Sequence, residues 1–393
     1  LGAACVTDFG LRIADCGLKG AGIAKAATSL LPAAIALALT LLYGQSKLHS
    51  LLPTPHSKLR TVRLALIQGN TLADWKYDAD RQRQIMEEYI GLSQKALAQA
   101  AADGKPIDLV VWPETMFRSG LFSFAPGVEL PPSLGRTKEE ITAIGPRDLA
   151  GLVSELETPV LVGIDRIEYV PGATAELPDF RMYNSSALVD RDGNIVGTYD
   201  KFHLVMFGEY VPFSKWLPFL KRISSITGSA EAGAGPVALC VDGVCYSPNI
   251  CYETVIPHVI RHQVATLDAA GQRPDVLVNL TNDAWYWGSS ELDMHLACDV
   301  FRAVETRTPL VIAANGGISA WIDSVGRVRA ESPRQQPDVI LADVELNRDR
   351  PPTVYVRTGD WFAAACLTAC IALAIIGFTA RRNHRDTENT EKK

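Results

Sequence analysis

The fold is decided by an apolar run that ends in a polar turn, VCYSPNICYE at residues 244–253. The first seven residues favour a short strand, and Cys251 follows directly at its end. A helical pattern over residues 255–270 comes next, and residues 275–279 form another apolar run. Strand, helix and strand in succession predict an α/β unit with a thiol at the end of its first strand.

The same alternation extends outward over residues 61–347, which predicts one layered α/β domain. Apolar side chains at helical spacing, such as Ile85, Tyr89 and Ala96, mark its first helix, and Gly104 ends that helix. Asp192-Gly193 predicts a hairpin turn. The predicted strands span residues 62–68, 108–112, 160–167, 184–189, 194–199, 244–250, 275–279, 310–314 and 339–344, and the predicted helices span residues 78–102, 146–156, 255–270 and 292–306.

Three predicted strands end at polar residues that could react together. Glu114 stands in Trp-Pro-Glu-Thr, Lys201 in Tyr-Asp-Lys-Phe-His, and Cys251 in Asn-Ile-Cys-Tyr-Glu. Active groups gather where strands end and loops begin. A carboxylate can take the thiol proton, the thiolate can attack a carbonyl, and an ammonium with a backbone N–H can hold the oxyanion.

Each of the three residues also has a plain structural interpretation when it is taken alone. Cys251 could be a buried apolar-like residue, Glu114 a loop carboxylate, and Lys201 a solvated hairpin end. Their shared position at strand ends favours the catalytic interpretation.

The composition limits the class of protein. Of 393 residues 47% are hydrophobic, which is enough for a large core, and the formal net charge is -6. A chain with this charge lacks the basic surface that neutralises phosphates, so a nucleic-acid partner is not expected.

Two uncharged apolar segments predict membrane helices. The first covers residues 26–46 and the second covers residues 361–380. Arginines at 381, 382 and 385 follow the second segment, and the positive-inside rule therefore places the C-terminal tail in the cytoplasm and the catalytic domain outside. We expect a membrane region at residues 1–60, a catalytic domain at 61–347, and a linker, membrane helix and tail at 348–393.

The eight cysteines do not describe a disulfide scaffold. Cys240 and Cys245 flank Asp242-Gly243, so a hairpin turn should place the two thiols opposite each other on neighbouring strands. A bridge would form in an oxidising compartment, but two small core side chains are the favoured interpretation.

Together these motifs resemble known families. The order and spacing of Glu114, Lys201 and Cys251 are similar to the Glu-Lys-Cys triad of the nitrilase superfamily, also called carbon–nitrogen hydrolases, whose fold is a four-layer αββα sandwich. Further motifs resemble the apolipoprotein N-acyltransferase family: Gly-Glu-Tyr-Val-Pro-Phe at 208–213, Asn-Asp-Ala-Trp at 282–285, Arg-Ala-Val-Glu at 302–305 and Asn-Gly-Gly-Ile-Ser at 315–319.

The resemblance implies an activity and a location. That family moves an acyl chain from a phospholipid to the N-terminal amine of a diacylglyceryl-cysteine lipoprotein, on the outer face of the inner membrane. Cys251 would then be the nucleophile, Glu114 the general base and Lys201 the oxyanion stabiliser. The implied partners are the phospholipid donor, the lipoprotein acceptor and the membrane, and neither a cofactor nor a metal is implied.

The resemblance also implies supporting residues. Glu209 and Glu253 match two further acidic positions of the family, although Glu209 could instead form a structural ion pair. The backbone N–H of Tyr252 would join the oxyanion hole. Substrate contacts are expected from Trp285 and from a ring near the first strand, where this chain has Trp75 and Tyr77 around the family's usual Trp position.

Two apolar loops, residues 117–130 and 206–226, are expected beside these motifs and favour contact with lipid, unless they pack on the domain's own core. Members of the family carry several helices ahead of the catalytic domain, so a fragment or a shortened form is expected. A membrane-tethered amidase or nitrilase of small molecules would use the same triad but release ammonia. A non-catalytic binding module is the remaining alternative.

Overall fold

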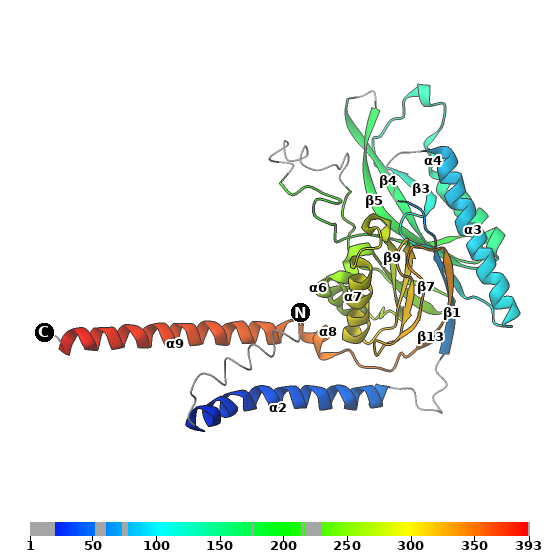
Figure 1. Ribbon diagram of the computed structural model, residues 1–393. Coiled ribbons are helices and arrows are strands. Elements are labelled where there is room, and N and C mark those ends of the chain that lie inside the picture. The colour runs from blue at the N-terminus through cyan, green and yellow to red at the C-terminus, as the bar shows by residue number, and fades with distance from the viewer. Residues whose placement is uncertain are drawn as a thin grey trace. The chain divides into compact units, whose positions relative to one another are not determined.

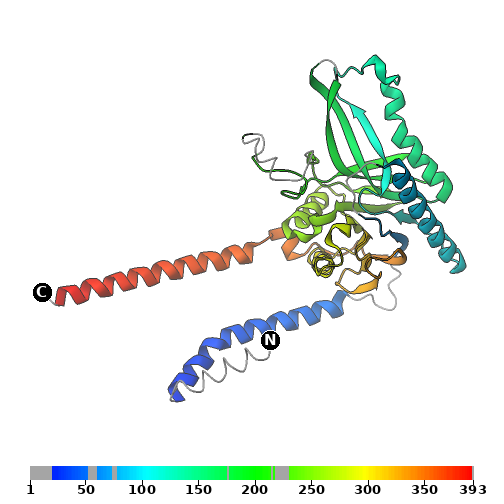
Figure 2. The same ribbon diagram turned by 45° about the horizontal axis from the view of Figure 1, so that its top comes forward.

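The computed structural model of the protein describes residues 20–51, 60–72, 78–174, 177–213, 216 and 230–391. Internal contacts divide the chain into two compact units, Leu1–Lys58 and Leu59–Lys393. The described part of the first unit is helix α2, Gly20–Leu51. The second unit contains two β-sheets and the helices that cover them (Figures 1 and 2).

The first sheet has the strand order β13-β1-β2-β4-β5-β6, and β3 pairs with β4 beside this path. Strands β1, β2 and β4 are parallel, as strand–helix–strand succession requires, whereas β13, β5 and β6 join antiparallel. The strands are β1 Arg60–Gln68, β2 Leu109–Val111, β3 Phe117–Phe124, β4 Val160–Thr174, β5 Leu177–Val189, β6 Ile195–Asp200 and β13 Asp338–Leu346.

The second sheet has the order β12-β11-β10-β9-β8-β7. Its central strands β8, β9 and β10 are parallel, and the outer strands join antiparallel. The strands are β7 Leu239–Val241, β8 Val244–Ile250, β9 Val276–Asn282, β10 Leu310–Asn315, β11 Ala320–Ile322 and β12 Val328–Glu331.

Helices begin and end where local chemistry predicts. The Asp78 carboxylate accepts the backbone N–H groups of Asp80 and Arg81 at the start of α3, and Gly104 takes a positive φ of 66° just after its end. The helices are α3 Ala79–Ala102, α4 Lys138–Thr142, α5 Ile144–Leu156, α6 Pro257–Ala269, α7 Glu291–Thr306, α8 Val354–Thr358 and α9 Trp361–Glu391, with 3-10 turns η1 Pro132–Leu134, η3 Cys251–Val255 and η4 Asp283–Tyr286.

Alternation along the strands produces the layers. On β1, Leu64 and Leu66 face a core shared with the second sheet, whereas Ala65 and Ile67 face a core shared with α3 and α5. A third core lies between the second sheet and helices α6 and α7. In Figure 1, α3 covers one outer face and α6 and α7 cover the other. Helix, sheet, sheet and helix follow in that order, as the predicted αββα sandwich requires.

The predicted strands and helices of the domain all form, with ends that shift by a few residues. Two predictions were incomplete or wrong. Residues 117–130 are not an apolar surface loop, because β3 pairs with β4 and its Phe117 and Leu121 side chains are buried against α5. The hairpin of β4 and β5 also extends well beyond the predicted strand ends.

The cysteine pair corrects a further expectation. Cys240 and Cys245 are direct cross-strand partners on β7 and β8, as the Asp242-Gly243 turn predicts. The two residues form a disulfide, so the favoured interpretation as unbridged core side chains was wrong. The Cys240 side chain lies on the exposed side of β7 rather than in the core, which removes the packing reason for a free thiol.

One stretch within the described residues, Trp361–Thr379 of α9, is long and apolar enough to cross a membrane. It coincides with the second predicted membrane segment. The first predicted segment, residues 26–46, is helical throughout as part of α2, and its role as a membrane span stays a prediction.

The fold makes one glycine essential to the position of Glu114. A β-carbon on Gly163 of β4 would lie 2.6 Å from both Glu114 Cα and Thr115 N. We expect Gly163→Ala to push the Glu114 turn away and to lower the free energy of unfolding by about 1–3 kcal/mol. Thermal unfolding in detergent measures this. Gly151→Ala in α5 is the matched control, because its β-carbon meets nothing within 4 Å. An equal response of the two variants would contradict the prediction.

Candidate active site

Cys251 stands where strand β8 passes into the turn η3. Its φ is +53°, a left-handed conformation that costs a non-glycine residue about 1–3 kcal/mol. The side-chain amide of Asn279, on the neighbouring strand β9, donates to the Cys251 carbonyl oxygen at 3.1 Å. The sharp turn at Cys251 is therefore held from the adjacent strand.

Glu114 follows β2 and is 8% exposed. Its carboxylate accepts the Asn184 side-chain amide at 2.6 Å and the Asn282 backbone N–H at 2.8 Å. Burial raises the pKa of Glu114, and Glu209 adds to the rise, while Lys201 and the two hydrogen bonds oppose it. The carboxylate is therefore a stronger proton acceptor than an exposed glutamate.

Lys201 directly follows β6 and is only 1% exposed. Its Nζ forms an ion pair with Glu209 Oε1 at 2.9 Å. Burial lowers the pKa of this ammonium, but the negative charges of Cys251, when its sulfur is ionised, and of Glu114 and Glu209 outweigh burial and raise the pKa above its ordinary value. Lys201 therefore stays charged inside the protein.

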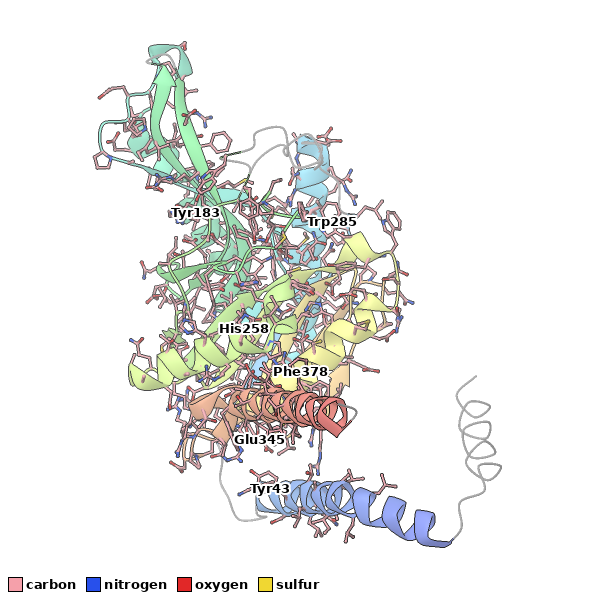
Figure 3. All side chains as sticks on the ribbon, turned by 90° about the vertical axis from the view of Figure 1, so that its left-hand side faces the viewer. Tyr43, Tyr183, His258, Trp285, Glu345 and Phe378 are labelled. Atoms are coloured by element: carbon pink, nitrogen blue, oxygen red, sulfur yellow. A yellow bond between two sulfur atoms is a disulfide. The ribbon has the colours of Figure 1, made fainter. Side chains whose placement is uncertain are left out.

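The three side chains line one cavity of about 430 Å³. Figure 3 shows Tyr183 and Trp285 near this end of the domain and Glu345 near the other end. Trp285 lines the cavity, and its contact with a substrate stays a prediction, whereas Trp75 and Tyr77 lie outside the described residues. The lining residues are Glu114, Thr115, Asp165, Met182, Asn184, Lys201, Val205, Phe207, Gly208, Glu209, Ala230, Cys251, Asn282, Trp285 and Tyr286.

The resting sulfur of Cys251 is a thiol. Burial raises its pKa well above the ordinary value, and Glu114 raises it further. Lys201 and a hydrogen bond with Thr281 lower it by less. A base must therefore remove the proton as the sulfur attacks, and the carboxylate of Glu114 in the same cavity can do so.

Glu253 clamps the two loops that carry Lys201 and Cys251. Its carboxylate accepts the backbone N–H groups of Phe202 at 3.1 Å and His203 at 3.0 Å, directly after Lys201. It also accepts the Ile250 N–H at 2.8 Å, directly before Cys251, and the Tyr199 hydroxyl at 2.6 Å. These contacts give this fully buried side chain a positioning role.

Glu209 has both an ion-pair partner and a backbone partner. Besides its ion pair with Lys201, the Glu209 carboxylate accepts hydrogen bonds from the Asn184 amide at 3.3 Å and from the Val205 N–H at 2.8 Å.

Tyr252 follows the thiol in η3 and is 37% exposed. Its proposed part in an oxyanion hole stays a prediction.

Residues of two sequence motifs hold the turn that carries Cys251, Arg302 directly and Asp283 through His295, whose Nε2 lies 3.0 Å from the Thr254 hydroxyl. Arg302 forms an ion pair with Glu305 at 2.7 Å and donates to the Thr254 carbonyl oxygen at 3.2 Å, within the turn that carries Cys251. Asp283 accepts the Thr281 hydroxyl at 2.7 Å and contacts His295 Nδ1 at 3.3 Å.

Sequence reasoning missed Asn184 and Asp165, which both line the cavity. Asn184 is the residue that connects Glu114 with Glu209. The sequence contains only one sign of a role for Asn184. It is a polar residue at the start of a predicted strand, on the strand face that also carries the core residue Leu188.

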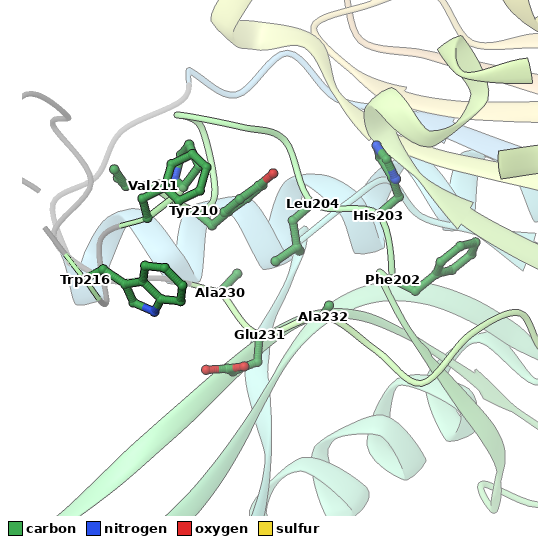
Figure 4. Close-up of a pocket in the computed structure, with 11 residues that line it drawn as sticks. Phe202, His203, Leu204, Tyr210, Val211, Trp216, Ala230, Glu231 and Ala232 are labelled. Carbon is green, nitrogen blue, oxygen red and sulfur yellow. The ribbon is translucent and has the colours of Figure 1, made fainter. Parts of the chain in front are cut away.

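A second hollow, of about 560 Å³, lies beside the first and shares Ala230 with it. Figure 4 shows its wall, which contains Phe202, Tyr210 and Trp216. Phe207, Phe213 and Trp216 are 59%, 71% and 85% exposed. For its described residues, the predicted apolar surface at 206–226 is therefore present.

Comparisons with known proteins identify the family of the chain. The carbon–nitrogen hydrolase family model matches residues 63–351. The chain is 35% identical to an apolipoprotein N-acyltransferase of Geobacter metallireducens over 350 residues, which are 89% of this chain and 59% of the relative. It is 31% identical to one of Rhodopirellula baltica over 353 residues, 85% of this chain and 60% of the relative. The chain thus spans about three fifths of these relatives.

Among solved structures, an amidase of the nitrilase superfamily from Nesterenkonia AN1 aligns with a TM-score of 0.47 and 17% identity, over 75% of this chain and 93% of the amidase.

The charges around Cys251 predict opposite effects of two substitutions. Glu114 raises the thiol pKa and Lys201 lowers it. Glu114→Gln should therefore move the pH midpoint of Cys251 alkylation by iodoacetamide to lower pH, and Lys201→Met should move it to higher pH. Peptide mass spectrometry measures both, with Cys298 on α7 of the same molecules as the internal control. A shift of both variants in one direction would refute this electrostatic account.

The Glu253 clamp predicts a loss of stability when the acceptor becomes an amide. Glu253→Gln would turn an NH₂ group toward backbone N–H donors, which leaves buried donors unsatisfied and should cost about 1–3 kcal/mol. Chemical denaturation provides the measurement. Glu87→Gln on the exposed side of α3 should change stability by less than about 0.5 kcal/mol. Equal stability of the Glu253 variant and the parent would mean that the clamp is dispensable.

Proposed function

Because the chain belongs to the carbon–nitrogen hydrolase family, we propose that it transfers an acyl chain from a phospholipid to the N-terminal amine of a diacylglyceryl-cysteine lipoprotein. The observation that carries the proposal is the cavity shared by Glu114, Lys201 and Cys251. The names of the relatives, apolipoprotein N-acyltransferases, support this substrate class.

In the first half-reaction, Cys251 attacks the ester carbonyl of the phospholipid. Glu114 takes the thiol proton as the S–C bond forms, and Lys201 with the Tyr252 N–H stabilises the oxyanion. The ester C–O bond then breaks, and Glu114 returns the proton to the leaving oxygen. The products are an acyl-Cys251 thioester and a lysophospholipid.

In the second half-reaction, the acceptor amine attacks the thioester carbon. The N–C bond forms, the C–S bond breaks, and a proton from the nitrogen returns through Glu114 to the sulfur. Glu209 forms an ion pair with Lys201 and so keeps the Lys201 side chain charged in both half-reactions. The result is an amide and a free thiol, so the cycle can repeat.

We also propose a location at the outer face of the cytoplasmic membrane. Trp361–Thr379 has the length and composition of a membrane helix, and the arginines that follow favour a cytoplasmic tail. The Cys240–Cys245 disulfide fits an oxidising compartment. The exposed Phe207, Phe213 and Trp216 near the cavity provide apolar surface for the acyl chains of the donor. Residues 26–46 would form a second span.

Within this proposal the substrate contacts come from Trp285 and from Trp75 or Tyr77. The domains are the membrane region 1–60, the catalytic domain 61–347 and the C-terminal region 348–393.

The thioester predicts a measurable intermediate. Incubation of the purified protein with phospholipid and no acceptor should raise its mass by one acyl chain, and hydroxylamine should remove the added mass. Cys251→Ala should stay unmodified. Cys298→Ser, which removes another free thiol of the domain, should acylate like the parent. Intact mass spectrometry measures all three.

Two outcomes would contradict the proposal. Acylation that persists in Cys251→Ala would mean a different nucleophile. Release of ammonia from small amides, with no acyl-enzyme from phospholipid, would favour a membrane-tethered amidase.

A further inference from the structure

Two strands present polar side chains to the cavity from the same side. On β4, Leu161 faces the core between the sheets, and Asp165 lies four residues further along the same face. Asp165 and Asn184 are direct cross-strand partners on β4 and β5, so their side chains are neighbours. Both residues line the cavity that contains Glu114, Lys201 and Cys251.

This wall carries hydrogen-bond acceptors that have no donor. The Asn184 Oδ1 atom is buried and has no hydrogen-bond partner, while the NH₂ group of the same side chain donates hydrogen bonds to Glu114 and Glu209. Within the described part of the chain, no hydrogen bond reaches the Asp165 carboxylate. Burial raises the pKa of Asp165, and the charge of Arg118 opposes the rise.

Arg118 forms no hydrogen bond with the Asp165 carboxylate in the part of the chain that the structure describes. Its guanidinium donates to the Gln82 side chain and to the Thr115 carbonyl oxygen, and it does not line the cavity. The buried Asn184 Oδ1 is costly without a donor, and the half-buried Asp165 carboxylate opens into the cavity, so a ligand that brings N–H groups would be bound favourably at this wall.

The charge of the cavity selects the kind of ligand. The carboxylates of Glu114, Asp165 and Glu209 line it together with one ammonium, Lys201, which is already paired. A cavity with an excess of negative charge concentrates cations and disfavours anions. The phosphate of a phospholipid is therefore a poor match for the Asp165 wall, whereas a protonated amine matches both its charge and its acceptors.

We propose that Asp165, together with Asn184 Oδ1, binds the protonated primary amine of the acyl acceptor and so determines specificity in the second half-reaction. This inference rests on the proposed acyl transfer. The bound ammonium loses one proton to solvent before it attacks, and the amine nitrogen loses a second proton to the sulfur through Glu114 as the C–S bond breaks. Overall, the thioester and ammonium give an amide, a thiol and one released proton.

The test measures each half-reaction separately in the Asp165→Asn variant. Acyl-enzyme formation from vesicles of phosphatidylglycerol, a donor that has no amine, should stay within about twofold of the parent. Discharge by a synthetic diacylglyceryl-cysteinyl peptide with a free amine should need about 10- to 100-fold more peptide, the loss expected for one charge-assisted hydrogen bond. Discharge by 2-mercaptoethanol, a neutral thiol, should be unchanged.

Asp179→Asn is the matched control, because it makes the same chemical change at an exposed position of the same hairpin. It should behave like the parent in all three assays.

The outcomes distinguish this inference from the proposed function. If the parent forms no acyl-enzyme, the proposed function fails. If the parent acylates and transfers, and Asp165→Asn does so with the same peptide requirement, the Asp165 assignment is wrong. Equal slowing of discharge by the amine and by the neutral thiol would also overturn it, because the residue would then act on structure rather than on the charged acceptor.

Discussion

A buried ammonium sets the requirements for the rest of the site. Moving the charge of Lys201 out of water costs several kcal/mol unless partners replace the water. Glu209 supplies the ion pair at 2.9 Å, and Glu114 supplies a second carboxylate in the same cavity. Those carboxylates need donors in turn, and the Asn184 amide contacts both of them. The geometry around Cys251 thus exists before any substrate arrives, which is the condition for electrostatic catalysis.

The sandwich puts this network at one end of its central core. Inner-face side chains are apolar along most of each strand and become polar where the strand ends. On β9, Leu280 belongs to the core and Asn282, the last residue of the strand, lies in the cavity. On the longer strand β4 the change from the core to the cavity occurs inside the strand, between Leu161 and Asp165. Parallel strands align these ends, so residues far apart in the sequence meet there.

The sequence was most informative where chemistry coincides with a strand end. Glu114, Lys201 and Cys251 each follow an apolar run, so their meeting could be predicted without coordinates. Asp165 could not be found in this way, because it lies inside a predicted strand and its importance depends on the register that pairs it with Asn184. Strand β3 was missed because polar residues and a glycine interrupt its apolar pattern. The Asp242-Gly243 turn predicted which cysteines face each other, but pairing geometry does not state whether the thiols are oxidised.

The disulfide and the proposed nucleophile, which lie at the ends of one strand, require opposite redox states of sulfur. Cys245 and Cys251 lie at the two ends of β8, about 20 Å apart at the rise of an extended chain. A compartment that oxidises the first could also oxidise the second, since thiolates are the species that react. Burial and the neighbouring carboxylate of Glu114 keep the pKa of Cys251 high, so little thiolate is present at rest. In the proposed mechanism, reactivity then depends on a carbonyl reaching the cavity, where Glu114 removes the proton only as the S–C bond forms. The raised pKa would therefore make the proposed nucleophile selective as well as resistant to oxidation.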